Sequence, residues 1–218
     1  MRLFAPTPLA LLSLSVLAAS GCAKDPTEGK TAAKVEVAQA VQAAPAVAEA
    51  EVLSVTPATS KIGFIGAKVT AQHVGEFKDF QGKVSLKEGK IEGGQLEFEV
   101  KIDSVIVDGG LPRLEGHLKS DDFFDMENHP TARFVSTEIR QGSDTEGMSH
   151  TVVGNLTLRG TTKSVSFPAR IDVTDGAVRA MTEFGINRKD FNIVYAGKAD
   201  DLIQDNVLLQ VELDAKRS

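Results

Sequence analysis

One stretch decides the fold: residues 111–137 read LPRLEGHLKSDDFFDMENHPTARFVST. Unlike the segments on either side, this stretch does not have the pattern of a strand. Three of its leucines recur at the spacing of one helix face: Leu111, Leu114 and Leu118. Pro112 stands in the first turn, where its missing N–H costs no hydrogen bond. The pattern therefore predicts a short helical insertion near residues 111–125.

The rest of the stretch carries two adjacent phenylalanines, Phe123 and Phe124, and then becomes extended. Ser120 and Asp121 are candidate caps for a short turn that presents these two rings. Pro130 ends any helix, because the residue before a proline is pushed out of the α region. A helical connection thus interrupts a chain of strands, and we expect it to cover one end of a barrel.

Strand patterns occupy most of the remaining chain. The clearest is at residues 96–102, where apolar side chains alternate strictly with charged ones. Asp175-Gly176 is the signal of a two-residue hairpin. The other expected strands are 61–67, 75–87, 133–141, 151–159, 163–173, 177–186 and 206–216, with a turn or short helix at 68–72. Eight strands predict an all-β fold, an eight-stranded antiparallel barrel, because closing the sheet removes its exposed edges.

The amino terminus has the pattern of a secretion signal. Arg2 precedes an apolar run that is too short to span a bilayer. Residues 17–22, LAASGC, resemble a bacterial lipobox, in which the cysteine receives a diacylglyceryl group. Cys22 is the only cysteine in the chain, so it is the predicted lipidation site. An ordinary signal peptide with an incidental cysteine is the alternative.

These signals predict three parts: a lipoprotein signal peptide at residues 1–21, a lipidated Cys22 with a tether through residue 51, and a barrel domain at 52–218. The tether is rich in alanine, valine and glutamate and has no aromatic residue. Its side chains bury too little surface to offset the entropy of ordering, so we expect it to be flexible. A helix packed on the domain is the alternative.

Composition narrows the function further. The net charge is −6, and no basic stripe suggests a nucleic-acid partner. The aromatic residues are 11 Phe and 1 Tyr with no Trp, a set that suits a purely apolar interior. A single cysteine excludes an internal disulfide and a cysteine-based zinc cluster. No two histidines have metal-ligand spacing, and no nucleophile elbow or phosphate loop is present, so we predict neither a metal site nor an enzyme.

Several spaced motifs resemble those of the YceI-like family. The motifs are GEF (75–77), FQG (80–82), HLKS (117–120), DFFD (122–125), PTA (130–132), FVST (134–137), GNLTLRGTTK (154–163) and INRKDF (186–191). The resemblance covers roughly residues 52–216. It implies a lipocalin-like barrel in the bacterial periplasm, whose hollow interior holds an amphiphile with a polyisoprenoid tail, such as a quinone. The family usually has histidine where Arg159 stands, so no role is transferred to that position.

Two sets of candidate site residues follow. The predicted apolar lining comprises Phe64, Phe77, Phe98, Phe123, Phe124, Phe134, Phe167 and Phe184. The alternative for each is ordinary core packing, or docking of the insertion for Phe123 and Phe124. The head-group candidates are Arg113, His117, Asn187 and Arg188. For these we favour structural roles, with Arg188 fixing the turn at residues 186–191 and His117 holding the insertion.

The leading hypothesis is a membrane-tethered carrier or reservoir for an apolar amphiphile, with no cofactor. Its partners would be the apolar lipid and the membrane, through acylated Cys22, and a homodimer is left open. Position 23 is alanine, which by the sorting rule of Gram-negative lipoproteins favours the outer membrane. The pattern alone does not separate a hollow barrel from a filled one. The alternatives are an anchored structural or interaction module with a filled barrel, for example in envelope stress, and a hydrolase or isomerase acting on a bound lipid.

Overall fold

The computed structural model describes residues 23–39 and 51–216. Its strands are β1 Lys34–Val37, β2 Glu51–Val55, β3 Lys61–Lys68, β4 Ala71–Phe77, β5 Phe80–Lys87, β6 Lys90–Lys101, β7 Val105–Val107, β8 Thr131–Gln141, β9 His150–Leu158, β10 Thr161–Val173, β11 Ala177–Asn187, β12 Gly197–Lys198, β13 Asp201–Leu202 and β14 Asn206–Lys216. The helical elements are α1 Pro112–Lys119 and two 3-10 turns, η1 Ile102–Ser104 and η2 Arg188–Phe191.

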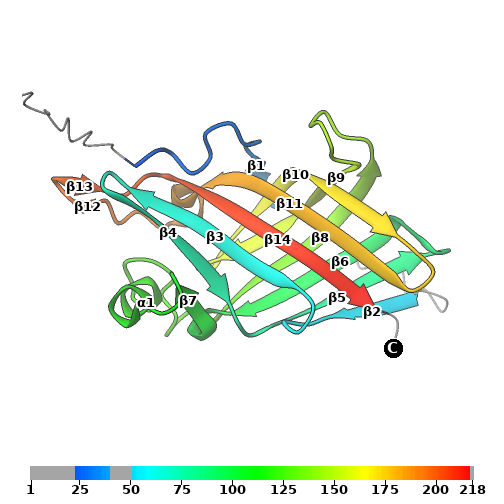
Figure 1. Ribbon diagram of the computed structural model, residues 1–218, viewed down its shortest axis with the longest axis horizontal. Helices are drawn as coiled ribbons and strands as arrows, with labels where there is room; N and C mark the ends of the chain where they lie inside the picture. Colours follow the sequence, from blue (N-terminus) through cyan, green and yellow to red (C-terminus); the bar gives the residue numbers. More distant parts are fainter. Residues whose placement is uncertain (1–22, 40–50, 217–218) are drawn as a thin grey trace, which may run out of the picture.

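The main sheet closes on itself. Strand β11 pairs with both β10 and β14, which completes the ring β10-β9-β8-β6-β5-β2-β14-β11. All the strand ladders are antiparallel, and the closed ring has eight strands, the number that the sequence predicts. Its members differ in one place, because the ring includes β2, which was not expected, and leaves out β3, the expected strand 61–67. Figure 1 shows this barrel with the helix at one end. The predicted fold class is therefore confirmed, including the short helical insertion.

Strands β3, β4 and β7 extend the sheet beyond the ring, on the side of β14. Strand β14 pairs with β3 over Leu208–Glu212 and reaches β2 only at Lys216. The predicted single strand 75–87 is wrong, because it is two strands, β4 and β5. At the corner between them, Lys78 donates its N–H to Ser104 O at 3.2 Å, and Asp79 O accepts from Lys101 N–H at 2.9 Å. Because of these bonds, the backbone of residues 78 and 79 belongs neither to the β4 ladder nor to the β5 ladder.

Of the two possibilities expected at residues 68–72, a turn or a short helix, the structure has the turn of a tight β3–β4 hairpin, because pairing across the hairpin begins at Lys68 and Ala71. The expected flexible tether is wrong for residues 34–37, which form β1 and pair with β10. That pairing satisfies backbone groups at an otherwise open stretch of β10, a nonlocal gain that composition does not reveal. Residues 40–50 of the expected tether, and the signal peptide with Cys22, lie outside the described residues.

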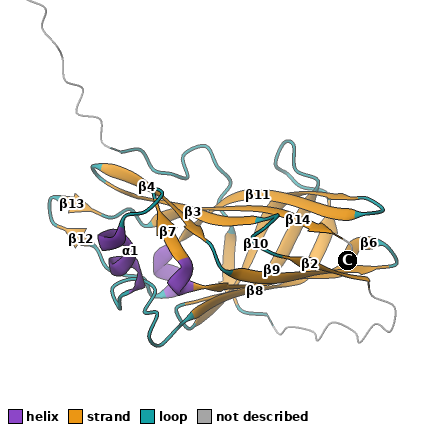
Figure 2. Cartoon of the chain, turned by 60° about the horizontal axis from the view of Figure 1, so that its bottom comes forward, coloured by secondary structure: helices purple, strands orange, loops and turns teal. Residues whose placement is uncertain are grey.

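Helix α1 is tied to the adjacent strand β7. Pro112 begins the helix, where no N–H is needed. The Glu115 carboxylate accepts hydrogen bonds from the N–H groups of Val107 and Leu111, at 3.1 and 3.0 Å. Leu118 is buried in the core. The insertion thus stands at the end of the barrel, beside β4 and β7 (Figure 2).

Candidate functional site: the barrel cavity

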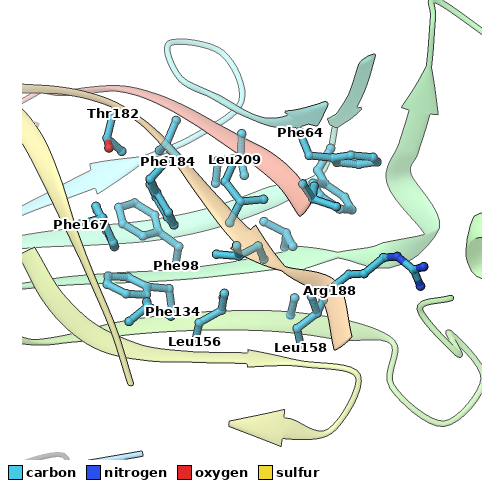
Figure 3. A pocket seen from close by; sticks show the side chains of 18 of the residues that line it. Phe64, Phe98, Phe134, Leu156, Leu158, Phe167, Thr182, Phe184, Arg188 and Leu209 are labelled. Carbon is cyan, nitrogen blue, oxygen red and sulfur yellow. The ribbon is translucent and has the colours of Figure 1, made fainter. Parts of the chain in front are cut away.

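The barrel encloses a cavity of about 230 Å³. Six strands of the ring line it, β6, β8, β9, β10, β11 and β14, together with β3 and β4. Helix α1 and the following turn contribute Leu118, Phe123 and Phe124. The wall is almost entirely hydrocarbon, and its polar side chains are Arg133, Thr182, Arg188 and Gln204. Figure 3 shows the phenylalanine and leucine side chains converging on this space. A dry, apolar chamber of this kind favours a hydrocarbon ligand over a polar one.

Glycines in the strands explain why the centre stays open. Gly75 is paired with Phe64 across β3 and β4, and the Phe64 ring lies so close that an added Cβ would be 2.2 Å from its Cζ. The same arrangement holds for Gly82 under Phe98, with a closest approach of 2.4 Å. Gly154 lies under Phe134 at 2.4 Å. The rings therefore lie flat on the backbone of the neighbouring strand instead of filling the centre.

The other predicted rings close the wall and one end. Phe167 of β10 and Phe184 of β11 stack with centroids 4.1 Å apart and planes 5° apart. Phe124 meets Phe64 edge-on at 6.2 Å and Phe77 at 6.0 Å, so the insertion packs against the β3–β4 rings. All eight phenylalanines of the predicted lining contact the cavity. Their role in binding a ligand stays a prediction.

Of the four head-group candidates, the structure brings only Arg188 to the cavity. Arg188 is 3% exposed, and its guanidinium donates to Gln204 O at 2.9 Å and Ile193 O at 2.6 Å, with Asp205 at 3.2 Å. Burial lowers the pKa of Arg188, and Asp205 opposes this shift. Figure 3 shows the guanidinium pointing away from the apolar side chains. Its donors hold the 193–205 loop, a structural role, rather than the turn at residues 186–191 that the alternative named.

The other three candidates hold local structure. His117 Nε2 lies 2.9 Å from Asp122 Oδ2, and its ring contacts Phe123 edge-on at 5.0 Å. The Asn187 side chain accepts from Lys189 N–H at 2.9 Å and caps η2. Arg113 is exposed on α1. None of these three lines the cavity.

Residues 53–215 match the family model of the YceI-like domain. The chain belongs to the YceI-like family. A UPF0312 protein of Photorhabdus laumondii is 36% identical over 141 residues, which are 59% of this chain and 69% of that relative. A UPF0312 protein of Pectobacterium carotovorum is 34% identical over 125 residues, covering 55% of this chain and 62% of the relative. The YceI-like chain thus spans about two thirds of the length of these relatives.

Solved structures agree on the YceI-like fold. Burkholderia cenocepacia BcnA has a TM-score of 0.63 and 24% identity, covering 74% of this chain and 99% of that chain. A domain from Saccharophagus degradans, described as polyisoprenoid binding and implicated in plant cell wall breakdown, has a TM-score of 0.59 and 14% identity. It covers 77% of this chain and 100% of its own. At these identities the likeness shows the fold alone.

Arg159, which stands where YceI-like chains usually have histidine, joins two loops. Its guanidinium donates to Asn192 O at 2.6 Å and to Asp121 O at 2.5 Å. Arg159 itself has a positive φ of 48°, and the next residue, Gly160, has a φ of 68°. The side chain therefore connects the β9–β10 turn to the insertion and to the end of η2, and it does not line the cavity.

Several residues that line this YceI-like barrel were not among the predicted ones. Most are aliphatic: Ile62, Leu96, Val152, Leu156, Leu158, Ile186, Leu209 and Val211. They share the inward face of each strand with the phenylalanines, so period-two alternation was the signal that could have found them. Gln204 had no such signal. Its Nε2 donates to Ala23 O at 3.1 Å, and its buried Oε1 has no partner within the described part of the chain.

Among residues 23–39 and 51–216, no cluster of three His, Cys, Asp or Glu side chains has the arrangement of a metal site. Within the same ranges, no helix has the length and apolar character needed to cross a bilayer.

Proposed function

We propose that this protein is a lipid-anchored envelope protein that binds an apolar amphiphile with a polyisoprenoid tail in its barrel, as a carrier or reservoir. The observation that carries the proposal is the enclosed cavity with its hydrocarbon wall. Burying about ten tail carbons releases on the order of 8 kcal/mol before the costs of binding. No catalytic group is needed for this task. The name of the Saccharophagus degradans domain supports this ligand class.

The volume of the cavity limits how much of the ligand's tail it can hold. Its 230 Å³ is slightly below the range of roughly 300–1,000 Å³ for pockets that hold drug-sized molecules. The cavity therefore accommodates a short tail segment as it stands. A longer prenyl chain requires rings such as Phe167 and Phe184 to change rotamer or the tail to extend beyond the barrel. The filled barrel of the alternative hypothesis lacks such a space.

The residue that follows the proposed anchor contacts a residue of the cavity wall. Ala23, which directly follows Cys22, accepts a hydrogen bond from Gln204, a lining residue, and donates its N–H to Val69 O at 2.7 Å. Acyl chains on Cys22 would hold this end of the barrel close to the bilayer. The alanine at position 23 favours the outer membrane as that bilayer. Two or more chains are needed, because one gives only marginal membrane binding.

The test uses a substitution that fills the cavity. Gly66 lines the cavity, and a Cβ added there meets no atom within 4 Å, so Gly66→Leu places a side chain in the open space. We expect prenyl lipid to copurify with the native protein, as measured by mass spectrometry of gently extracted samples, and to be lost from Gly66→Leu.

The matched control is Gly116→Leu, which adds the same side chain in open space on exposed α1. It should retain the lipid. Equal lipid in all three proteins would show that binding does not occur in the cavity. Repeated extraction without lipid from the native protein would favour the structural or interaction module.

A further inference from the structure

The hydrogen-bonded ladder between β10 and β11 is short for two neighbouring strands of the barrel. Their ladder covers only Arg170–Val173 of β10 with Val178–Met181 of β11. It ends at Pro168, which has no N–H to donate, and whose carbonyl accepts from the hydroxyl of Thr182 at 2.6 Å instead of from a backbone group. Beyond this point the two strands are not paired with each other. We call this region the seam, formed by residues 161–168 of β10 and 182–187 of β11.

The amino-terminal segment fills the seam. Lys34–Val37 pair antiparallel with Lys163–Ser166 of β10. On the other side, Gly185 of β11 donates its N–H to Thr31 O at 2.9 Å and accepts from Ala33 N–H at 2.8 Å. Figure 1 shows this segment, in blue, running along the barrel to its place beside β10. We call residues 27–37 the strap.

The strap closes the sheet at this place, although none of its residues lines the cavity. Val165 and Phe167 of β10 and Phe184 of β11 line the cavity next to the seam, and the two rings stack across it. Ala33 and Val35 of the strap pack against the same core. Moving the strap away would therefore open a gap between two unpaired strand edges, next to apolar side chains that line the cavity.

The strap is shorter than the strands around it. It contributes one four-residue strand, and Val37 at its end is 83% exposed. Its ion pair with β11, Lys30 with Glu183 at 2.5 Å, lies on the surface with side chains 44% and 38% exposed, so it adds little stability. Beyond β1, Gln39 exchanges two hydrogen bonds with the Asn155 side chain, at 3.1 and 2.6 Å. None of the ladders that close the ring, including the short one between β10 and β11, runs through the strap. Its departure would therefore break no ladder of the ring, and the open edge of β10 would favour its return.

We propose that the strap is a displaceable segment of the wall and that the seam beneath it is the lateral entrance for the hydrocarbon tail. The proposal rests on the proposed function for the class of ligand. The insertion with Phe124 covers one end of the barrel. A tail that enters through the side of the barrel does not have to displace this insertion. The strap also begins just after the predicted anchor at Cys22, which keeps the seam near the membrane.

A reversible crosslink tests the entrance. In a Cys22→Ser chain, Lys34→Cys and Ser166→Cys place two thiols at registered antiparallel positions, where Cα separations of about 4.5–5.5 Å suit a disulfide. The probe is N-phenyl-1-naphthylamine, an apolar dye that fluoresces when buried, followed by stopped flow. We expect uptake to be at least about tenfold slower in the oxidised protein than after reduction, as for other gated sites.

The matched control crosslinks the other edge of β10. Thr157→Cys with Thr162→Cys joins registered residues of β9 and β10, so it fastens the wall without touching the strap. Its oxidation should leave uptake unchanged. Equal uptake by the oxidised and reduced strap variant would overturn the proposal. Absence of dye binding in every sample would instead count against the proposed function.

Amide hydrogen exchange tests strap release without any ligand. We expect the amides of β1 to exchange at least about tenfold faster than those of β9, because the strap opens while the barrel remains folded. Equal protection of the two strands would overturn the proposal whether or not the dye binds.

A second pair of variants changes the strap by packing. A Cβ added at Gly185 would lie 2.8 Å from Thr27 Cγ2, so Gly185→Ala should push the strap away and speed both β1 exchange and dye uptake several-fold. Adding Thr27→Ser removes that methyl group but keeps the hydroxyl that bonds Asp25 at 2.6 Å. The double variant should recover part of the native rates. Slower exchange in Gly185→Ala would contradict the proposal.

Discussion

At the scale of single residues, the hollow interior depends on glycine. Phe64, Phe98 and Phe134 are large enough to fill the barrel, yet each ring lies over a glycine of the neighbouring strand. Any Cβ at that glycine would meet the ring. The absence of a side chain thus decides where a neighbouring ring goes. The motifs GEF, FQG and GNL each contain one of these glycines.

Gly82→Ala should therefore cost stability and cavity space. Its Cβ would lie 2.4 Å from Phe98 Cδ1 and 2.9 Å from Glu97 O, which the backbone cannot easily relieve. We expect the free energy of unfolding in urea to fall by about 1–3 kcal/mol, as for other overpacked cores. Gly66→Ala is the control, because its Cβ meets no atom within 4 Å. Equal losses in the two variants would show that the ring contact is not the cause.

Arg188 is a second residue whose role the structure defines. Arg188→Leu removes the donors for the carbonyls of Ile193 and Gln204, which the 193–205 loop needs. We expect a loss on the order of 3 kcal/mol in the free energy of unfolding, from unsatisfied buried groups. Arg159→Leu, whose side chain also serves two carbonyls but is less buried, should lose less. The reverse order in urea unfolding would refute this assignment.

At the scale of elements, side-chain carboxylates form hydrogen bonds that connect β4, β7 and α1 in addition to the strand ladders. Asp108 follows β7 and accepts from His73 Nδ1 at 2.6 Å and from the Val74 N–H at 2.8 Å, both on β4. The hydrogen bond from His73 is the main cause that lowers the pKa of Asp108, and the Val74 N–H adds to it. Glu115 plays the corresponding part between α1 and β7. Together they hold the insertion at the end of the barrel.

The Asp108 contact should make stability depend on pH. A carboxyl whose folded pKa is below its ordinary value of 3.8 stabilises the fold above that pH, and this contribution is lost as the pH falls through the folded pKa. Asp108→Asn should therefore lower the urea midpoint most at neutral pH, and the difference from the native protein should shrink once the pH falls below 3.8. A constant difference across this range would exclude the linkage.

At the scale of the whole molecule, the first described residue, Ala23, and the tip of the β3–β4 hairpin lie at the same end. Val69, Ala23 and Leu202 come together there, since Ala23 and Leu202 both bond the backbone of Val69. Leu202 is 49% exposed, and Val69 also has an exposed side chain. The β10–β11 hairpin lies at the opposite end of the barrel (Figure 1). The two ends of the molecule thus differ, and the end with exposed apolar side chains is the one that we propose to face a bilayer.

Leu202→Asp should slow ligand transfer for this reason. A charge at an apolar contact with lipid is unfavourable, so we expect decylubiquinone to pass several-fold more slowly between vesicles and the acylated protein, with equilibrium occupancy unchanged. Val173→Asp, at a residue that is 38% exposed beside the β10–β11 hairpin, is the matched control. Similar slowing by both substitutions would show that the 202 end has no special relation to the membrane.

The sequence by itself determined most of the long strands, the helical insertion and the inward phenylalanines. Alternation along a strand is a local property, so it identifies which side chains share a face before any partner strand is known. For the same reason the six predicted rings that lie on strands all reach the cavity. The hairpin at Asp175-Gly176 was likewise local, and residues 177–187 follow it as β11.

Only the tertiary structure decided whether those rings fill the barrel and what closes its wall. The contact of Phe98 with Gly82 depends on the register between two strands, and the pairing of Val35 with Val165 joins residues 130 positions apart. The composition of the amino-terminal segment predicted a tether, because its own side chains bury little. Its order comes instead from hydrogen bonds to backbone groups that β10 and β11 do not pair with each other. Those groups are aligned to bind a further strand only once the barrel has formed.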